Sequence, residues 1–133
     1  MDVALEAPTP LVAEERGQII GSLGFAGKAT GVICLNTGLN FAKVITSRML
    51  GIPEAETDDG EMVNDAFGEL SNMIVGRVKS RLCDAGWSCT LTIPSIVRGR
   101  DLRAEGPAQV SRKVIGFHTG EHRLLVELLL KQS

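Results

Sequence analysis

The segment GEMVNDAFGELSNMIVGRVKSRL, residues 60–82, carries apolar residues at helical spacing over its whole length. At about 100° per residue these side chains gather on one broad face, which predicts a long amphipathic helix packed on a core. Asp58 is placed to cap the first turn, and Glu61, three residues later, completes a capping-box-like pair. Gly86 lies just past the predicted end. The predicted core face consists of Val63, Phe67, Leu70, Ile74 and Val78, with Ala66 and Met73 at its edge.

Before this helix the chain predicts a hairpin and a first helix. The runs at 18–27 and 28–36 are rich in β-forming residues and meet at Ala26-Gly27. Their glycines Gly21, Gly24 and Gly31 are expected to relieve crowding or mark bulges, because a phosphate-binding loop would lie between a strand and a helix. Residues 39–50 then show helical spacing and end at Gly51.

After the long helix the pattern is that of strands. WSCTLTI, residues 87–93, alternates apolar and polar side chains, which predicts a strand with Trp87 and Ile93 on its buried face. Residues 94–107 are expected to form a loop, and 108–118 and 122–131 a long final hairpin. The last run, LLVELLL, is compatible with a helix by composition, and its hairpin context favours a strand.

This order, β-β-α-α-β-β-β, predicts an α+β domain. The expected architecture is an antiparallel sheet of about five strands with two long helices packed on one face. A chain of 133 residues fits one such domain. We expect residues 1–16 to form a flexible N-terminal lead-in or an edge strand, and residues 17–133 to form the domain.

Composition excludes several classes of function. The formal net charge of -2 and the lack of a basic tail argue against nucleic acid as a partner. No apolar run reaches the roughly 18 residues that a membrane span needs, so no membrane insertion is expected. The acidic N-terminus lacks the basic start of a signal peptide, and we expect a cytoplasmic protein.

No metal site is expected from this sequence. Three cysteines without CxxC spacing are a poor disulfide framework or zinc site, and Cys34 and Cys89 read as small buried apolar groups. His118 and His122 flank a turn without a third ligand. The basic residues Arg98, Arg100 and Arg103 are expected in a solvated loop, with contact to an acidic partner as the alternative.

The opposite face of the long helix carries Asp65, Glu69, Asn72 and Gly76 within about 60° of one another. Glu69 and Asn72 are neighbours at i, i+3. A glycine inside a helix is destabilising by roughly 1 kcal/mol relative to alanine, so Gly76 and Gly68 are interpreted as clearance for the backbone of a partner. The alternative is an ordinary solvated helix surface.

The chemistry of this pair is that of positioning. The Asn72 amide does not titrate and cannot act as a general base, but it donates and accepts hydrogen bonds and can hold a water in line for attack. Glu69 offers an ion pair to a lysine or arginine of a partner. Together they suit a reaction whose electrophile the partner supplies.

These residues resemble a known family. NDAFGELSNMIVGRVKS, residues 64–80, resembles the signature helix of the CheC/CheX chemotaxis phosphatases, with its E-x-x-N pattern at Glu69 and Asn72 and its following glycine at Gly76. LTIPSIVRG at 91–99 resembles the family's strand and PT-V-x-G turn, and FAKVITSRMLG at 41–51 its upstream helix. The similarity covers roughly residues 17–131.

The resemblance implies an enzyme: a phosphatase that hydrolyses the phospho-aspartate of a CheY-like receiver domain of a response regulator. Glu69 would dock on a receiver lysine and Asn72 would orient the attacking water, while Asp65, Gly68 and Gly76 would contact the partner. The protein would need no cofactor of its own, and Mg2+ would sit on the receiver.

Only one E-x-x-N helix is present, which resembles the single-site, CheX-like branch. Members of that branch pair into homodimers through their sheets, so a homodimer is expected, with the long terminal strands supplying the edges. One alternative is a non-catalytic receiver-binding or flagellar-switch-like adaptor that uses the same helix face. Another is a structural dimer whose polar helix face has no partner.

Overall fold

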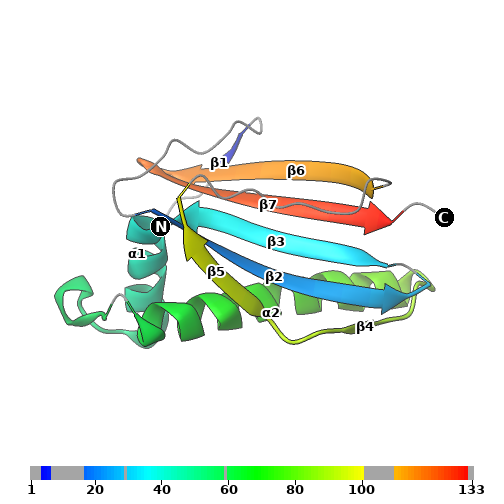
Figure 1. Cartoon of the computed structure of the whole chain (residues 1–133), viewed down its shortest axis with the longest axis horizontal. Helices are drawn as coiled ribbons and strands as arrows, with labels where there is room; N and C mark the ends of the chain where they lie inside the picture. Colours follow the sequence, from blue (N-terminus) through cyan, green and yellow to red (C-terminus); the bar gives the residue numbers. More distant parts are fainter. Residues whose placement is uncertain (1–3, 7–16, 29, 59, 101–109, 132–133) are drawn as a thin grey trace.

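The structure, a computed structural model, describes residues 4–6, 17–28, 30–58, 60–100 and 110–131. Seven strands form one antiparallel sheet in the order β1-β6-β7-β3-β2-β4, with β5 also paired to β2. Both α-helices lie on one side of it (Figure 1). The elements are β1 (Ala4–Glu6), β2 (Gln18–Gly27), β3 (Gly31–Gly38), α1 (Leu39–Leu50), the 3-10 helix η1 (Glu54–Glu56), α2 (Glu61–Asp84), β4 (Cys89–Leu91), β5 (Ser95–Gly99), β6 (Val110–Thr119) and β7 (His122–Lys131).

This architecture confirms the predicted α+β class and the two helices on one antiparallel sheet. The predicted hairpins are both present: β2 pairs with β3, and β6 pairs with β7 around Gly120, which has a φ of 56°. The run LLVELLL is a strand, as its hairpin context indicated. The two strands beyond the expected five are β1 and β5. β1 pairs with β6 and lies within residues 1–16, for which an edge strand was one of the two expectations.

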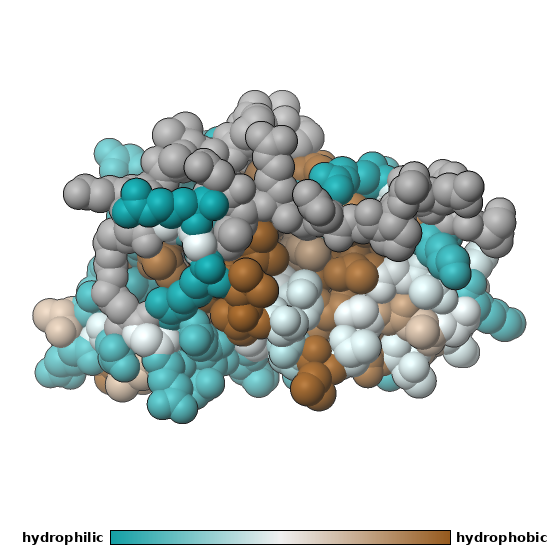
Figure 2. Space-filling view, viewed as in Figure 1, coloured by the Kyte–Doolittle hydropathy of each residue, from teal (hydrophilic) through white to brown (hydrophobic). Residues whose placement is uncertain are grey.

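The region between α2 and β6 differs from its prediction. Residues 95–99, expected in a loop, form β5, and the strand expected at 87–93 shortens to β4, so Trp87 and Ile93 are exposed instead of buried. Both strands pair with β2 and are separated by Thr92, Ile93 and Pro94. Proline cannot donate to the ladder, and a strand interrupted by it stays at an edge. Figure 2 shows apolar residues at the surface in the middle of this view, where β5 and the β4–β5 connection lie.

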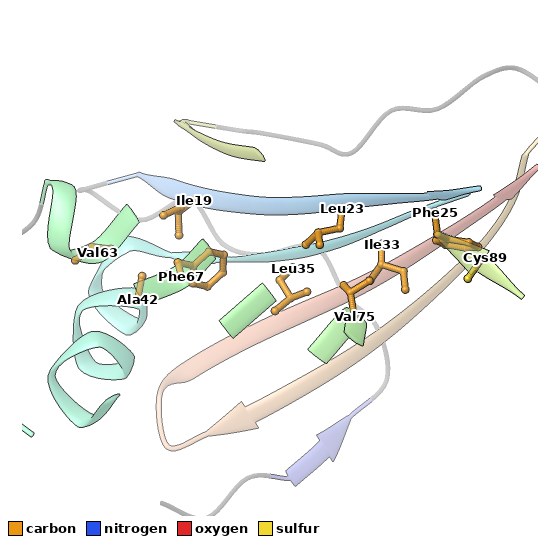
Figure 3. Packing of buried hydrophobic residues seen from close by; sticks show 10 residues of the cluster. All are labelled: Ile19, Leu23, Phe25, Ile33, Leu35, Ala42, Val63, Phe67, Val75 and Cys89. Atoms are coloured by element: carbon orange, nitrogen blue, oxygen red, sulfur yellow. The ribbon is translucent and has the colours of Figure 1, made fainter. Parts of the chain in front are cut away.

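The core lies between α2 and the middle of the sheet. In Figure 3, side chains of β2 and β3 point toward Phe67 and Val75 of α2. The most deeply buried positions of α2 are Val63, Phe67, Ser71 and Val75, at i, i+4, i+8 and i+12. The predicted core face was therefore displaced around the helix: Leu70, Ile74 and Val78 are only partly buried, and Met73 is exposed.

Gly21 of β2 lets α2 approach the sheet this closely. A Cβ at Gly21 would overlap the Ser71 hydroxyl and lie 3.2 Å from the Phe67 ring. The buried Ser71 hydroxyl donates to the Phe67 carbonyl at 2.8 Å, so no polar group is left unpaired at this contact. Crowding also explains Gly31, where a Cβ would press on the Phe25 ring and the Leu129 carbonyl.

Arg98 of β5 ties the start of α2 to the sheet. Its Nε donates to the Asn64 side-chain oxygen at 2.7 Å and its Nη2 donates to the Gly60 carbonyl at 2.9 Å. The expectation that Arg98 is a solvated loop residue was wrong, because β5 turns its side chain toward α2; Arg103 lies outside the described residues. The capping box was also wrong: Asp58 accepts the Gly60 N–H at 3.0 Å, and the N-cap of α2 is Gly60 without a side-chain cap.

The cysteines are all free. Cys34 and Cys89 are buried, which confirms their interpretation as small apolar groups, and Cys83 is exposed. Burial, and to a lesser degree the nearby Glu127 carboxylate, raises the pKa of the Cys34 thiol to about 11. This thiol therefore stays neutral across the physiological range.

The Gly21 contact yields a test of the core. Gly21→Ala should lower the free energy of unfolding by about 1–3 kcal/mol, the usual cost of overpacking, because α2 must shift away from β2. Urea unfolding measures this. Gly24→Ala on the same strand is the matched control, since its Cβ would meet Thr92 at an ordinary 3.4 Å. An equal loss of unfolding free energy in both variants would contradict the assigned contact. In the double variant, Ser71→Ala should recover part of the stability lost in Gly21→Ala, because it removes the overlapping hydroxyl.

Candidate functional site

The four polar-face residues predicted from the sequence lie together on α2. Asp65, Glu69 and Asn72 are exposed and Gly76 is partly exposed, and we call these four residues the α2 ridge. They share a face because their spacing of three or four residues brings each to nearly the same angle around the helix. The opposite face is held in the core through Phe67 and Ser71, so the ridge points away from the sheet.

Gly76 and Gly68 have different surroundings. No atom lies within 4 Å of the position that a Gly76 Cβ would occupy, so the helix backbone is bare next to Asn72. Gly68 is instead buried, and its Cβ position lies 3.8 Å from Ile96 of β5. A Cβ at Gly68 would make only an ordinary van der Waals contact with Ile96. Gly68 is thus buried beside β5, and the open surface predicted for it is not there.

The ridge combines a fixed backbone with unrestrained side chains. Within the described residues, no hydrogen bond or ion pair holds the side chains of Asp65, Glu69 or Asn72. The backbone beneath them is held by the core contacts and by Arg98 at the N-terminal end. The amide of Asn72 can therefore turn to meet a ligand without breaking a bond inside the protein.

Two hollows lined by described residues lie elsewhere. One of about 400 Å³ is lined by Asn40, Lys43, Val44, Glu54, Ala55 and His122. Another of about 610 Å³ is lined by Gly27, Lys28, Thr30, Leu82, Trp87, Leu130 and Lys131. Neither includes a residue of the α2 ridge, which lies on an exposed helix face. A small-molecule substrate is usually enclosed in a concave pocket, whereas an exposed helix face suits a substrate presented by another protein.

His122 is packed against an aromatic ring of α1. His122 stacks on Phe41 of α1, with ring centroids 4.8 Å apart and an interplanar angle of 8°, so it joins the β6–β7 turn to α1. Among the residues that the structure describes, no group of three or more His, Cys, Asp or Glu side chains is arranged to hold a metal ion. None of the described helices is both long enough and apolar enough to cross a membrane.

Sequence reasoning missed two features of this surface. The exposed methionines Met62 and Met73 flank the ridge, although Met73 was expected at the edge of the core face. The Arg98–Asn64 bond was missed because the two residues are 34 positions apart and no local pattern joins them. The burial of Gly68 was likewise missed, since it depends on where β5 lies, whereas the open space at Gly76 agrees with its prediction from the sequence.

Known proteins resemble this chain in sequence and in fold. The sequence model described as "Chemotaxis phosphatase CheX" matches residues 19–118. The CheY-P phosphatase CheX of Thermotoga maritima is 31% identical over 85 residues, which are 64% of this chain and 54% of that protein. The alignment thus spans about half the length of this relative.

Solved structures share the fold over nearly the whole chain. The chemotaxis protein CheX of Vibrio vulnificus has a TM-score of 0.78 at 24% identity and covers 96% of this chain and 83% of its own. CheX in a complex with CheY, BeF3 and Mg2+ from Borrelia burgdorferi has a TM-score of 0.77 at 18% identity and covers 99% of this chain and 82% of its own. Since the family model matches well over half of the residues, the chain belongs to the chemotaxis phosphatase CheX family.

Proposed function

We propose that this protein hydrolyses the phospho-aspartate of a CheY-like receiver domain. The observation that carries the proposal is the exposed, unrestrained Asn72 amide between Glu69 and the bare backbone of Gly76. Family membership supports it, as does the relative named a CheY-P phosphatase. The exposed position of the ridge, outside the two hollows, supports a substrate that arrives on another protein.

Docking comes first in the proposed mechanism. Glu69 forms an ion pair with a lysine of the receiver, which sets the angle at which α2 approaches. Gly76 lets a receiver loop come against the helix backbone, because nothing projects there within 4 Å. Asp65, one turn before Glu69, adds negative charge on the same face and favours the same cationic partner surface.

Hydrolysis then depends on water placement. The Asn72 side-chain oxygen accepts a hydrogen bond from a water. This bond orients the water so that a lone pair of the water oxygen faces phosphorus, in line with the phosphorus–aspartate bond. The oxygen of water bonds to phosphorus, the phosphorus–aspartate bond breaks, and the electron pair leaves with the aspartate carboxylate. Inorganic phosphate is released. Phosphoryl transfer depends mainly on positioning and electrostatic stabilisation, so an amide without a titrating proton suffices.

We assign Mg2+ to the receiver. The exposed carboxylates of the ridge, Asp65 and Glu69, lie on one face without a third acid or oxygen cage among the described residues. The ion supplies charge neutralisation of the phosphoryl oxygens, and the ridge supplies only the water-positioning amide and the docking carboxylate.

We also propose that the protein forms a homodimer through β6. The helices pack on β2, β3, β4 and β5, and the helix side of β6 is less covered, with Ile115 41% exposed. In register with it, Val126 of β7 continues the apolar surface. Among the described strands, β1 pairs with β6 over Gly116–His118, at the end of the sheet beyond β7. A strand at the edge of a sheet beside apolar surface is a ready template for a second strand.

Phosphate release tests the proposed activity. Wild type, Asn72→Ala and Glu69→Ala are incubated with phosphorylated receivers and Mg2+. We expect Asn72→Ala to lose at least about 10²-fold in kcat, because water is no longer aligned. Glu69→Ala should raise KM and recover at high concentration. Asp84→Ala, another exposed carboxylate of α2, is the control and should act as wild type. Binding without accelerated release would favour the adaptor function.

The glycine next to Asn72 gives a second prediction. Gly76→Ala should raise the free energy of unfolding by about 1 kcal/mol, because the site is open and alanine favours the helix. The same methyl group should obstruct the receiver and lower kcat/KM. Thermal unfolding and phosphate release measure the two effects. A variant that is more stable and fully active would contradict the role given to this clearance.

The dimer is tested by a charge on the apolar surface of β6. Ile115→Arg should convert the dimer to a monomer in size-exclusion chromatography with light scattering, because a guanidinium would be buried in the apolar contact. Val97→Arg, at a half-exposed valine of β5 near the opposite edge, is the matched control. A monomeric wild type would overturn the dimer, as would loss of the dimer in the control alone.

A further inference from the structure

All three internal methionines of this chain are exposed. Met49 of α1 is 40% exposed, and Met62 and Met73 of α2 are 38% and 54% exposed. Methionine is among the residues most often buried, so half-exposed methionines beside a functional ridge are informative. Exposed methionines are typical of adaptable binding surfaces, because the side chain is flexible and polarisable.

Two of these methionines border the α2 ridge. Met62 and Met73 are 11 positions apart, which places them about 20° apart around the helix and about 16 Å apart along it. Met73 lies one turn after Glu69 and directly follows Asn72 in sequence. We call Met62 and Met73 the methionine border. It lies on the flank of the ridge away from Gly68 and β5.

A partner that reaches Gly76 must also cover Met73. The two residues are i and i+3 on the helix and therefore neighbours on its surface. Glu69 lies four residues before Met73, so the two side chains are neighbours on the helix surface. A partner cation paired with Glu69 would therefore also lie next to Met73. Nothing restrains Met73 within the described residues, while the Met62 sulfur accepts a weak bond from the Asp58 N–H at 3.4 Å.

We propose that the methionine border binds an apolar patch of the receiver, next to the cation that pairs with Glu69. This inference rests on the proposed function and adds the chemistry of the partner surface: one cation flanked by exposed aliphatic or aromatic side chains. The border contributes to holding the receiver and not to placing the water. Its loss therefore raises KM and the dissociation constant and leaves kcat nearly unchanged.

Substitutions that remove or keep apolar surface test the inference. Met73→Ser and the Met62→Ser/Met73→Ser double variant lose the apolar contact, and Met73→Leu keeps it. Each is measured for kcat and KM with phosphorylated receiver, and for affinity to the same receiver loaded with BeF3 and Mg2+. We expect Met73→Ser to weaken binding about 5–10-fold, the double variant more, and Met73→Leu less than twofold, with kcat within twofold throughout.

Met49→Ser is the matched control, because it removes a methionine from α1 whose exposure, 40%, lies between those of Met62 and Met73. It should leave KM and affinity unchanged. Circular dichroism and thermal unfolding verify that each variant is folded. Unchanged affinity in the folded double variant would overturn the inference, and so would an equal loss in Met49→Ser or a fall in kcat without a change in KM.

The experiment separates this inference from the proposed activity. If wild type binds the receiver without releasing phosphate, and Met73→Ser weakens that binding, the phosphatase proposal fails while the methionine border stands. If wild type releases phosphate and the serine variants keep its KM, the activity stands and the border is overturned. If wild type neither binds nor releases phosphate from any receiver, both are overturned.

Discussion

The close approach of α2 to the middle of β2 is the contact on which the rest of the structure depends. It is possible because Gly21 has no side chain, so that the Phe67 ring and the Ser71 hydroxyl can lie directly on the strand. The hydroxyl is satisfied by a carbonyl of its own helix, and the contact is therefore buried without an unpaired polar group. This contact sets the rotation of α2 about its axis. A shift of one residue would turn the helix by about 100° and carry Asn72 toward the sheet.

A second set of contacts limits the tilt of the same helix. Arg98 holds the Gly60 carbonyl and the Asn64 side chain, while Ile96 lies 3.8 Å from the position that a Gly68 Cβ would occupy. β5 thus lies along one flank of α2 and leaves the other flank, with Met62 and Met73, open. The helix is fixed at its start and along its buried face, and only the side chains of the ridge remain free to adjust. For a reaction that depends on placing one water, this division is favourable, because small errors in orientation are costly.

The proposed chemistry needs little from this chain beyond position. The receiver brings the phosphoryl group, the leaving aspartate and the metal ion, and α2 adds one amide and one carboxylate. A pocket would hinder such a reaction, since the ridge must enter the partner's site. The described hollows, which lie at α1 and at the far end of α2, are accordingly not part of it. In the proposed mechanism, stability and function conflict at Gly76, where a residue unfavourable for the helix would keep the surface clear for the receiver.

The sequence by itself determined which segments are helices, which long runs pair as hairpins, and that Asp65, Glu69, Asn72 and Gly76 share one helix face. These properties follow from local periodicity and from turn residues, both of which are set by residues close together in the sequence. Only the tertiary structure decided the rest: that Ser71 and Val75 face the core while Met73 faces outward, that Gly68 is buried, and that β5 forms at residues expected in a loop. The reason is that these outcomes depend on contacts such as Gly21 with Ser71 and Arg98 with Asn64, whose partners are distant in sequence. Periodicity fixes the relative angles of residues on a helix, but the face that is buried depends on what it packs against.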